Sequence, residues 1–127
     1  MISIIDDDRS IREAVRSLIR SLGYEAVAFS SAEEYLRSDR VADSECIITD
    51  LQMPGMTGID LQHRLIEGGY QKPVILMSAR SAEDAGAHAM EPASCRFLRK
   101  PFGDDRLIEC LDRALGVSTK SPPNPLT

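Results

Sequence analysis

Apolar residues occur along this chain in two alternating patterns. Short apolar runs, typical of strands that are buried on both faces, occupy residues 2–5, 24–29, 46–49, 73–77 and 95–99. Between several of these runs, apolar residues recur at every third or fourth position, which is typical of amphipathic helices. The longest such stripe consists of Ile11, Ala14, Val15, Leu18, Ile19 and Leu22, and Gly23 follows it as a stop. The pattern therefore predicts five strands that alternate with helices.

Turn and capping signals predict where the other helices begin and end. Two consecutive serines are each followed three residues later by a glutamate, a capping-box signal for a second helix: Ser30 with Glu33, and Ser31 with Glu34. A loop with Pro and Gly at residues 53–58 precedes a third helix, expected over 59–67. A polar, alanine-rich segment at 81–90 would be the fourth helix. The last stripe consists of Leu107, Ile108, Leu111, Ala114 and Leu115, and Gly116 closes it.

Strands and helices in this order predict an α/β fold. We expect a doubly wound, five-stranded parallel sheet with helices on both faces, of the flavodoxin-like (βα)5 kind. In such sheets the functional residues collect at the carboxyl ends of the strands. Four of the predicted strands end in residues that can do chemistry, namely Asp6 and Asp7, Asp50, Ser78 and Lys100. Their shared position at one edge of the sheet predicts a single site.

The residue types at that edge suit phosphoryl transfer. Carboxylates brought together repel one another, and a hard divalent cation such as Mg²⁺ relieves that repulsion. Lys100 offers a positive charge, Ser78 offers a hydroxyl donor, and Asp50 can accept a phosphoryl group as an acyl phosphate. Taken singly, each residue also has an ordinary explanation, such as a helix cap for the first three aspartates or a turn for Asp50. Their joint placement favours the site.

Composition narrows the classes of protein. The chain has 127 residues, of which 43% are hydrophobic and 28% charged, as expected for one domain. We place that domain at residues 1–117, with a proline-containing tail or linker stub at 118–127. The net charge of −5 argues against direct nucleic-acid binding. Without a signal peptide or a membrane-length apolar run, a cytoplasmic location is expected and no membrane partner. The three cysteines, without paired spacing, are expected to be buried free thiols: Cys46, Cys95 and Cys110.

Four blocks of sequence, in order and well spaced, resemble the signature blocks of response-regulator receiver domains. They are Ile4-Ile-Asp-Asp-Asp8, Ile47-Ile-Thr-Asp-Leu-Gln-Met-Pro-Gly-Met-Thr-Gly58, Val74-Ile-Leu-Met-Ser-Ala79 and Phe97-Leu-Arg-Lys-Pro-Phe102. The resemblance extends from Ile2 to Leu115. Within the family, the block around Asp50 and the stretch from Ser31 look most like receivers that precede helix-turn-helix output domains.

This resemblance implies a phosphoacceptor of a two-component system. Asp50 would take a phosphoryl group from a sensor histidine kinase or a phosphotransfer protein, and the domain would catalyse its own phosphorylation and slow dephosphorylation without being a turnover enzyme. Asp7, Asp50 and the backbone carbonyl of Gln52 would bind Mg²⁺ directly, with Asp6 helping through water. Ser78 and Phe97 would form the conformational switch. A cis peptide between Lys100 and Pro101 is expected, as is a homodimer that depends on phosphorylation.

The chain departs from the family pattern around the predicted fourth helix. The family usually has Val where this chain has Glu83, and Gly86 costs about 1 kcal/mol relative to alanine inside a helix. Pro92 cannot continue a helix. We therefore expect a short or mobile helix within residues 81–94, and we hypothesise that phosphorylation orders it.

Three other functions fit the sequence less well. An aspartyl-phosphate phosphatase would carry Asp-x-Asp-x-Thr at the first strand, whereas this chain has Asp6-Asp-Asp-Arg-Ser10. A flavin binder of the same architecture would need a Gly-, Ser- or Thr-rich phosphate loop there, where three aspartates would repel a phosphate. A degenerate receiver that serves only as a docking surface would not need the complete set of acids.

Overall fold

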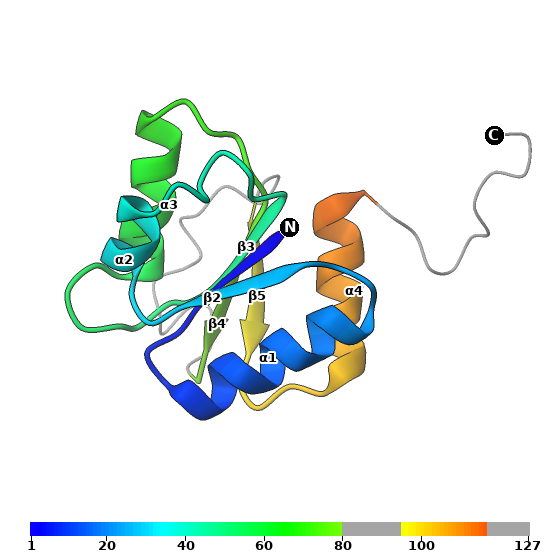
Figure 1. The fold of residues 1–127 in the computed structure, drawn as a ribbon. Helices are drawn as coiled ribbons and strands as arrows, with labels where there is room; N and C mark the ends of the chain where they lie inside the picture. The colour runs from blue at the N-terminus through cyan, green and yellow to red at the C-terminus, as the bar shows by residue number, and fades with distance from the viewer. Residues whose placement is uncertain (80–94, 117–127) are drawn as a thin grey trace, which may run out of the picture.

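The computed structural model describes residues 1–79 and 95–116 (Figure 1). The strands are β1 (Ile2–Ile5), β2 (Ala26–Phe29), β3 (Cys46–Asp50), β4 (Val74–Ser78) and β5 (Cys95–Arg99). The helices are α1 (Arg9–Ser21), α2 (Ala32–Arg37), α3 (Gly58–Glu67) and α4 (Asp104–Leu115). The helix predicted at 81–90, the expected domain boundary at 117 and the expected tail at 118–127 lie outside the described residues.

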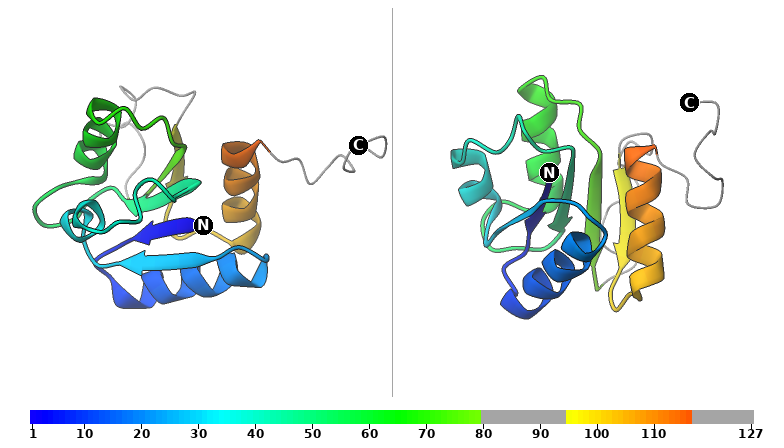
Figure 2. Two further views of the ribbon diagram at one scale, coloured as in Figure 1. Left: turned by 45° about the horizontal axis from the view of Figure 1, so that its top comes forward. Right: turned by 45° about the vertical axis from the view of Figure 1, so that its right-hand side comes forward.

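The five strands form one parallel sheet in the order β2-β1-β3-β4-β5. This order is the flavodoxin-like one, so the predicted fold class is confirmed. The chain leaves β1 for α1 on one face of the sheet, and it leaves the neighbouring strand β3 for α3 on the other face (Figure 2). The two connections therefore diverge between β1 and β3, which opens a crevice at the carboxyl ends of these strands.

The hydrophobic core consists of two layers, one on each face of the sheet. One layer contains side chains of α1 and α4, and the other contains side chains of α2 and α3. Because successive side chains of a strand point to opposite faces, both sets of strand residues are buried. This explains why all four residues of β1 and all five of β3 and β4 are buried. The apolar runs in the sequence are therefore a direct consequence of helices covering both faces.

The second strand begins two residues later than the sequence predicted. Gly23 has a φ of +97°, which turns the chain at the end of α1. The backbone N–H of Tyr24 then donates a hydrogen bond to the carbonyl of Ile19, within the last turn of the helix. Tyr24 therefore belongs to the helix terminus, and β2 begins at Ala26.

One of the two predicted capping pairs forms at the start of α2. Ser31 is the N-cap, and its hydroxyl accepts a hydrogen bond from the backbone N–H of Glu34 at 3.0 Å. The Glu34 carboxylate accepts bonds from both the backbone N–H and the hydroxyl of Ser30. The pairing of Ser30 with Glu33 is wrong, because only one residue can cap a helix and Ser31 occupies that position. The carboxylate of Glu33 instead accepts a hydrogen bond from the backbone N–H of Met56.

Gly58 allows the start of α3 to approach the end of β3. A Cβ atom at this position would lie 2.7 Å from the carbonyl oxygen of Asp50 and 2.7 Å from Cδ2 of Leu76. The backbone N–H of Gly58 donates a hydrogen bond to the carbonyl of Leu51 at 2.9 Å. The glycine thus closes the loop of residues 51–58 tightly against the strand that carries Asp50.

Cys46 and Cys110 are buried, as predicted. Burial raises the pKa of Cys46 to about 12, so its thiol is not reactive near neutral pH. Cys110 is buried in the core layer that contains α1 and α4. No helix in the described ranges combines the length and the apolar character that crossing a membrane requires.

Candidate functional site

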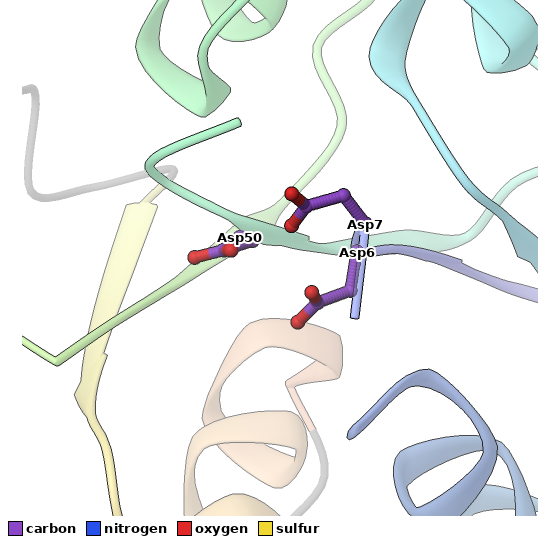
Figure 3. Close-up of side chains that lie close together, drawn as sticks. All are labelled: Asp6, Asp7 and Asp50. Carbon is purple, nitrogen blue, oxygen red and sulfur yellow. The ribbon is translucent and has the colours of Figure 1, made fainter. Parts of the chain in front are cut away.

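Three carboxylates from two neighbouring strands meet at the crevice. Asp6 and Asp7 directly follow β1, and Asp50 is the last residue of β3. One oxygen of each side chain lies within 4.8 Å of an oxygen of the other two, as the close-up in Figure 3 illustrates. Asp6 and Asp50 are buried, whereas Asp7 is exposed. The sheet therefore holds negative charge in a cleft that is open on one side.

Lys100, which follows β5, reaches the two buried acids. Its Nζ lies 3.3 Å from Oδ2 of Asp6 and 3.5 Å from Oδ1 of Asp50. Its backbone N–H donates a 2.7 Å hydrogen bond to the carbonyl of Ser78. The peptide bond between Lys100 and Pro101 is cis, as expected. The structure thus brings the three predicted aspartates and the predicted lysine together.

Asp8 caps a helix and does not join the two acids before it in the cluster. Its Oδ1 accepts hydrogen bonds from the backbone N–H groups of Ser10 at 2.9 Å and Ile11 at 3.2 Å. It is therefore the N-cap of α1, and it is not one of the three clustered carboxylates. Its own backbone N–H donates to Oδ1 of Asp6 at 2.8 Å. The cap thereby fixes the orientation of a site residue.

Two further contacts fix the backbone of Asp6. Its N–H donates to the carbonyl of Phe29 at 3.1 Å, which ties the end of β1 to the end of β2. Its carbonyl accepts a 2.7 Å bond from the guanidinium of Arg12, one turn into α1. The sequence did not predict this role of Arg12, because a guanidinium on a helix gives no sign of the carbonyl it will reach.

Burial makes the ionised state of the two inner acids unfavourable. Burial is the main cause that raises the pKa of Asp6, with a smaller rise from Asp7, against lowering by the Asp8 N–H and by Lys100. Burial and then the charge of Asp6 raise the pKa of Asp50, while Lys100 and the backbone N–H of Gln52 lower it. In both cases the pKa is raised overall, so the positive charge of Lys100 does not offset the cost of burying these two carboxylates.

The donor set fits a hard divalent cation. Three carboxylates that converge within a few ångströms, two of them buried with raised pKa values, supply the anionic oxygens that Mg²⁺ prefers. The exposed side of Asp7 leaves access for solvent and for a phosphate group. Gln52, two residues beyond Asp50, is exposed on the loop that borders the cleft.

Ser78 and Phe97 lie on the strands beyond Asp50. Ser78 is buried at the end of β4, one position past Met77, which is paired with Asp50 in the register of the sheet. Phe97 lies in β5 opposite Leu76, and its partly buried ring packs against the core layer that contains α2 and α3. Their placement is compatible with the predicted switch, which stays a prediction.

Residues 2–112 match the family described as the response regulator receiver domain. The response regulator protein TmoT of Ectopseudomonas mendocina is 34% identical over 124 residues, which are 98% of this chain and 56% of that protein. The transcriptional regulatory protein FixJ of Azorhizobium caulinodans is 33% identical over 119 residues, which are 94% of this chain and 56% of that protein.

Solved structures show the same likeness. A response regulator receiver domain protein from Clostridium thermocellum superposes with a TM-score of 0.80 at 26% identity, covering 91% of this chain and 93% of that one. The chemotaxis protein CheY4 of Vibrio cholerae superposes with a TM-score of 0.76 at 26% identity, covering 90% and 97%.

The chain therefore belongs to the response regulator receiver domain family, whose members are signalling domains of two-component systems. It spans little more than half the length of the curated relatives named above.

Replacing Asp50 by asparagine should stabilise the metal-free domain at pH 7. Because the pKa of Asp50 is higher in the folded protein than in the unfolded chain, its ionisation opposes folding once the pH exceeds the ordinary value of 3.8. Asparagine removes the charge and keeps the size. We expect the unfolding midpoint, measured by circular dichroism in EDTA, to rise by about 4 °C, the shift that ~1 kcal/mol produces in a domain of this size.

The gain should shrink as the pH falls from the raised pKa of folded Asp50 toward the ordinary value of 3.8, because the folded wild-type carboxyl group takes up its proton over that range. Asp43→Asn removes one exposed negative charge and should leave the midpoint within about 1 °C. An unchanged or lower midpoint for Asp50→Asn at pH 7 would contradict this account of the cluster.

Proposed function

We propose that this receiver domain accepts a phosphoryl group on Asp50, with Mg²⁺ bound beside it, and that this reaction switches its output surface. The observation that carries the proposal is the convergence of three carboxylates within 4.8 Å, with Lys100 in contact with Asp6 and Asp50. A buried anionic cluster costs folding free energy, so a stable domain retains it where it has a task.

The central position of Asp50 in the sheet favours it over its neighbours as the phosphoacceptor. Both oxygens of Asp6 are engaged, Oδ1 with the N–H of Asp8 and Oδ2 with Lys100. Asp50 ends the strand between β1 and β4 and therefore lies centrally among the other groups of the cleft. The block from Ile47 to Gly58 also resembles the part of receiver domains that carries the phosphoacceptor.

In the proposed reaction an oxygen of Asp50 attacks the phosphorus of a phosphohistidine. A P–O bond to Asp50 forms as the P–N bond breaks, and the imidazole nitrogen keeps the electron pair of that bond and takes a proton from solvent. Lys100 offsets negative charge on the oxygens of the phosphoryl group in transfer. Ser78 donates its hydroxyl hydrogen to the phosphoryl group once it is attached, and Phe97 moves inward behind it.

Asp7, Asp50 and the backbone carbonyl of Gln52 would hold the Mg²⁺, with Asp6 acting through a water molecule. When bound, the metal supplies positive charge that lets the acids and the phosphate oxygens lie close together. The engagement of both Asp6 oxygens within the protein supports its indirect role.

Receiver domains of this family interact with histidine kinases, and we propose that a sensor kinase or a phosphotransfer protein supplies the phosphoryl group to this one. The proposal includes a cytoplasmic location, a homodimer formed on phosphorylation, and no direct contact of this domain with nucleic acid. The relatives named above are longer than this chain, and one of them is named a transcriptional regulatory protein.

Incubation with acetyl phosphate and Mg²⁺ should add one phosphoryl group to the domain. Mass spectrometry of the intact protein should show a single increment that hydroxylamine removes, because an acyl phosphate is labile to nucleophiles. Asp50→Asn should gain none, and the matched control Asp43→Asn should gain it at the wild-type rate. If Asp50→Asn gains the increment at the wild-type rate, the assignment is wrong.

Metal affinity should fall in a defined order among the four acids. By isothermal titration calorimetry with MgCl₂, we expect Asp7→Asn and Asp50→Asn to lose measurable binding. Asp6→Asn should lose about tenfold, as an outer-shell partner does. Asp8→Asn should change the affinity by less than about twofold, because asparagine also caps a helix well. A greater loss for Asp8→Asn than for Asp7→Asn would refute the ligand assignment.

A further inference from the structure

Glu33 lies on α2, and its carboxylate contacts the loop that follows Asp50. Its Oε2 accepts a 3.1 Å hydrogen bond from the backbone N–H of Met56. The same oxygen lies 2.6 Å from the point that a Cβ on Gly55 would occupy, and Gly55 has a φ of +79°. The carboxylate therefore packs directly against the backbone of residues 55 and 56.

The first part of this loop is held by different forces. The side chains of Leu51 and Met53 are buried in the core layer that contains α2 and α3. Gln52 lies between them with its side chain exposed. Beyond Met53 the chain turns back toward α3, and two hydrogen bonds fix its return, one from the Met56 N–H to Glu33 and one from the Gly58 N–H to the carbonyl of Leu51. The position of the Gln52 carbonyl thus depends on anchors on both sides.

The segment that carries Glu33 also holds the other acid-bearing strand. The carbonyl of Phe29, four residues before Glu33, accepts the hydrogen bond from the N–H of Asp6. The turn between them is fixed by Ser30, which donates two hydrogen bonds to Glu34. The segment from Phe29 to Glu33 therefore makes hydrogen bonds both to the end of β1 and to the loop after β3.

We propose that Glu33 is a positioning residue for the metal site. By accepting the hydrogen bond of Met56 and packing on Gly55, it holds the loop of residues 51–58 so that the Gln52 carbonyl faces the cleft, and it thereby sets the affinity for Mg²⁺. This proposal rests on the proposed function. Glu33 is not itself one of the clustered carboxylates that could hold a metal ion in the described part of the chain.

A carboxylate near a cation site could also act through its charge alone, and one pair of variants separates the two causes. Glu33→Gln keeps an oxygen that can accept the bond from Met56 and removes the charge. Glu33→Ala removes both. Glu67→Ala is the matched control, because Glu67 is an exposed acid that lines the same polar hollow as Glu33 between α2 and α3.

Two measurements on these variants test the proposal. Amide hydrogen exchange in metal-free protein, followed by NMR, should be at least about tenfold faster at Met56 in Glu33→Ala, because its N–H loses the acceptor that protects it. Mg²⁺ affinity measured by calorimetry should fall on the order of fivefold in the same variant. Glu33→Gln and Glu67→Ala should match the wild-type protein in both, and circular dichroism should show all variants folded.

Wild-type exchange at Met56 and wild-type Mg²⁺ affinity in Glu33→Ala would overturn the proposal. A loss of affinity in Glu33→Gln as large as that in Glu33→Ala would overturn it too, because charge and not the hydrogen bond would be responsible. Failure of the wild-type protein to bind Mg²⁺ would instead refute the proposed function. In that event the exchange rate at Met56, measured without metal, still decides whether Glu33 holds the loop.

Discussion

The repulsion among Asp6, Asp7 and Asp50 is the constraint on which the rest of this structure depends. Two of these carboxylates are buried, and burial first, then repulsion from a neighbouring carboxylate, raises the pKa values of both. One half-buried lysine offsets this only in part. The fold holds the acids together because β1 and β3 are adjacent parallel strands in a sheet whose faces are covered by helices. A divalent cation and a phosphoryl group are the partners that such an arrangement suits.

The surrounding contacts hold the acids in place against that repulsion. The N–H of Asp8 and the ammonium of Lys100 each donate a hydrogen bond to one carboxylate oxygen of Asp6. The guanidinium of Arg12 donates one to the backbone carbonyl of Asp6. Gly58 lets α3 close against the backbone of Asp50. The site is thus built from short contacts at the ends of strands, and the two core layers beneath it supply the rigidity that keeps those ends in register.

Much of this arrangement could be predicted from the sequence, because its causes are local and periodic. Strands buried on both faces are mostly apolar, and each apolar run here ends within one residue of the end of its strand, which placed Asp50, Ser78 and Lys100 at one edge. Contacts between distant segments leave no such pattern. Nothing in the order of residues shows that Arg12 reaches the carbonyl of Asp6, or that Glu33 reaches Met56 in place of pairing with Ser30.

The central claim is that the acyl phosphate forms at Asp50. Sodium borohydride reduces an aspartyl phosphate to homoserine, which peptide sequencing by tandem mass spectrometry locates. After phosphorylation with acetyl phosphate and Mg²⁺, we expect homoserine at position 50 and aspartate unchanged at positions 6, 7 and 8. Homoserine at one of those three positions, or none in protein that carries the added phosphoryl mass, would contradict the account.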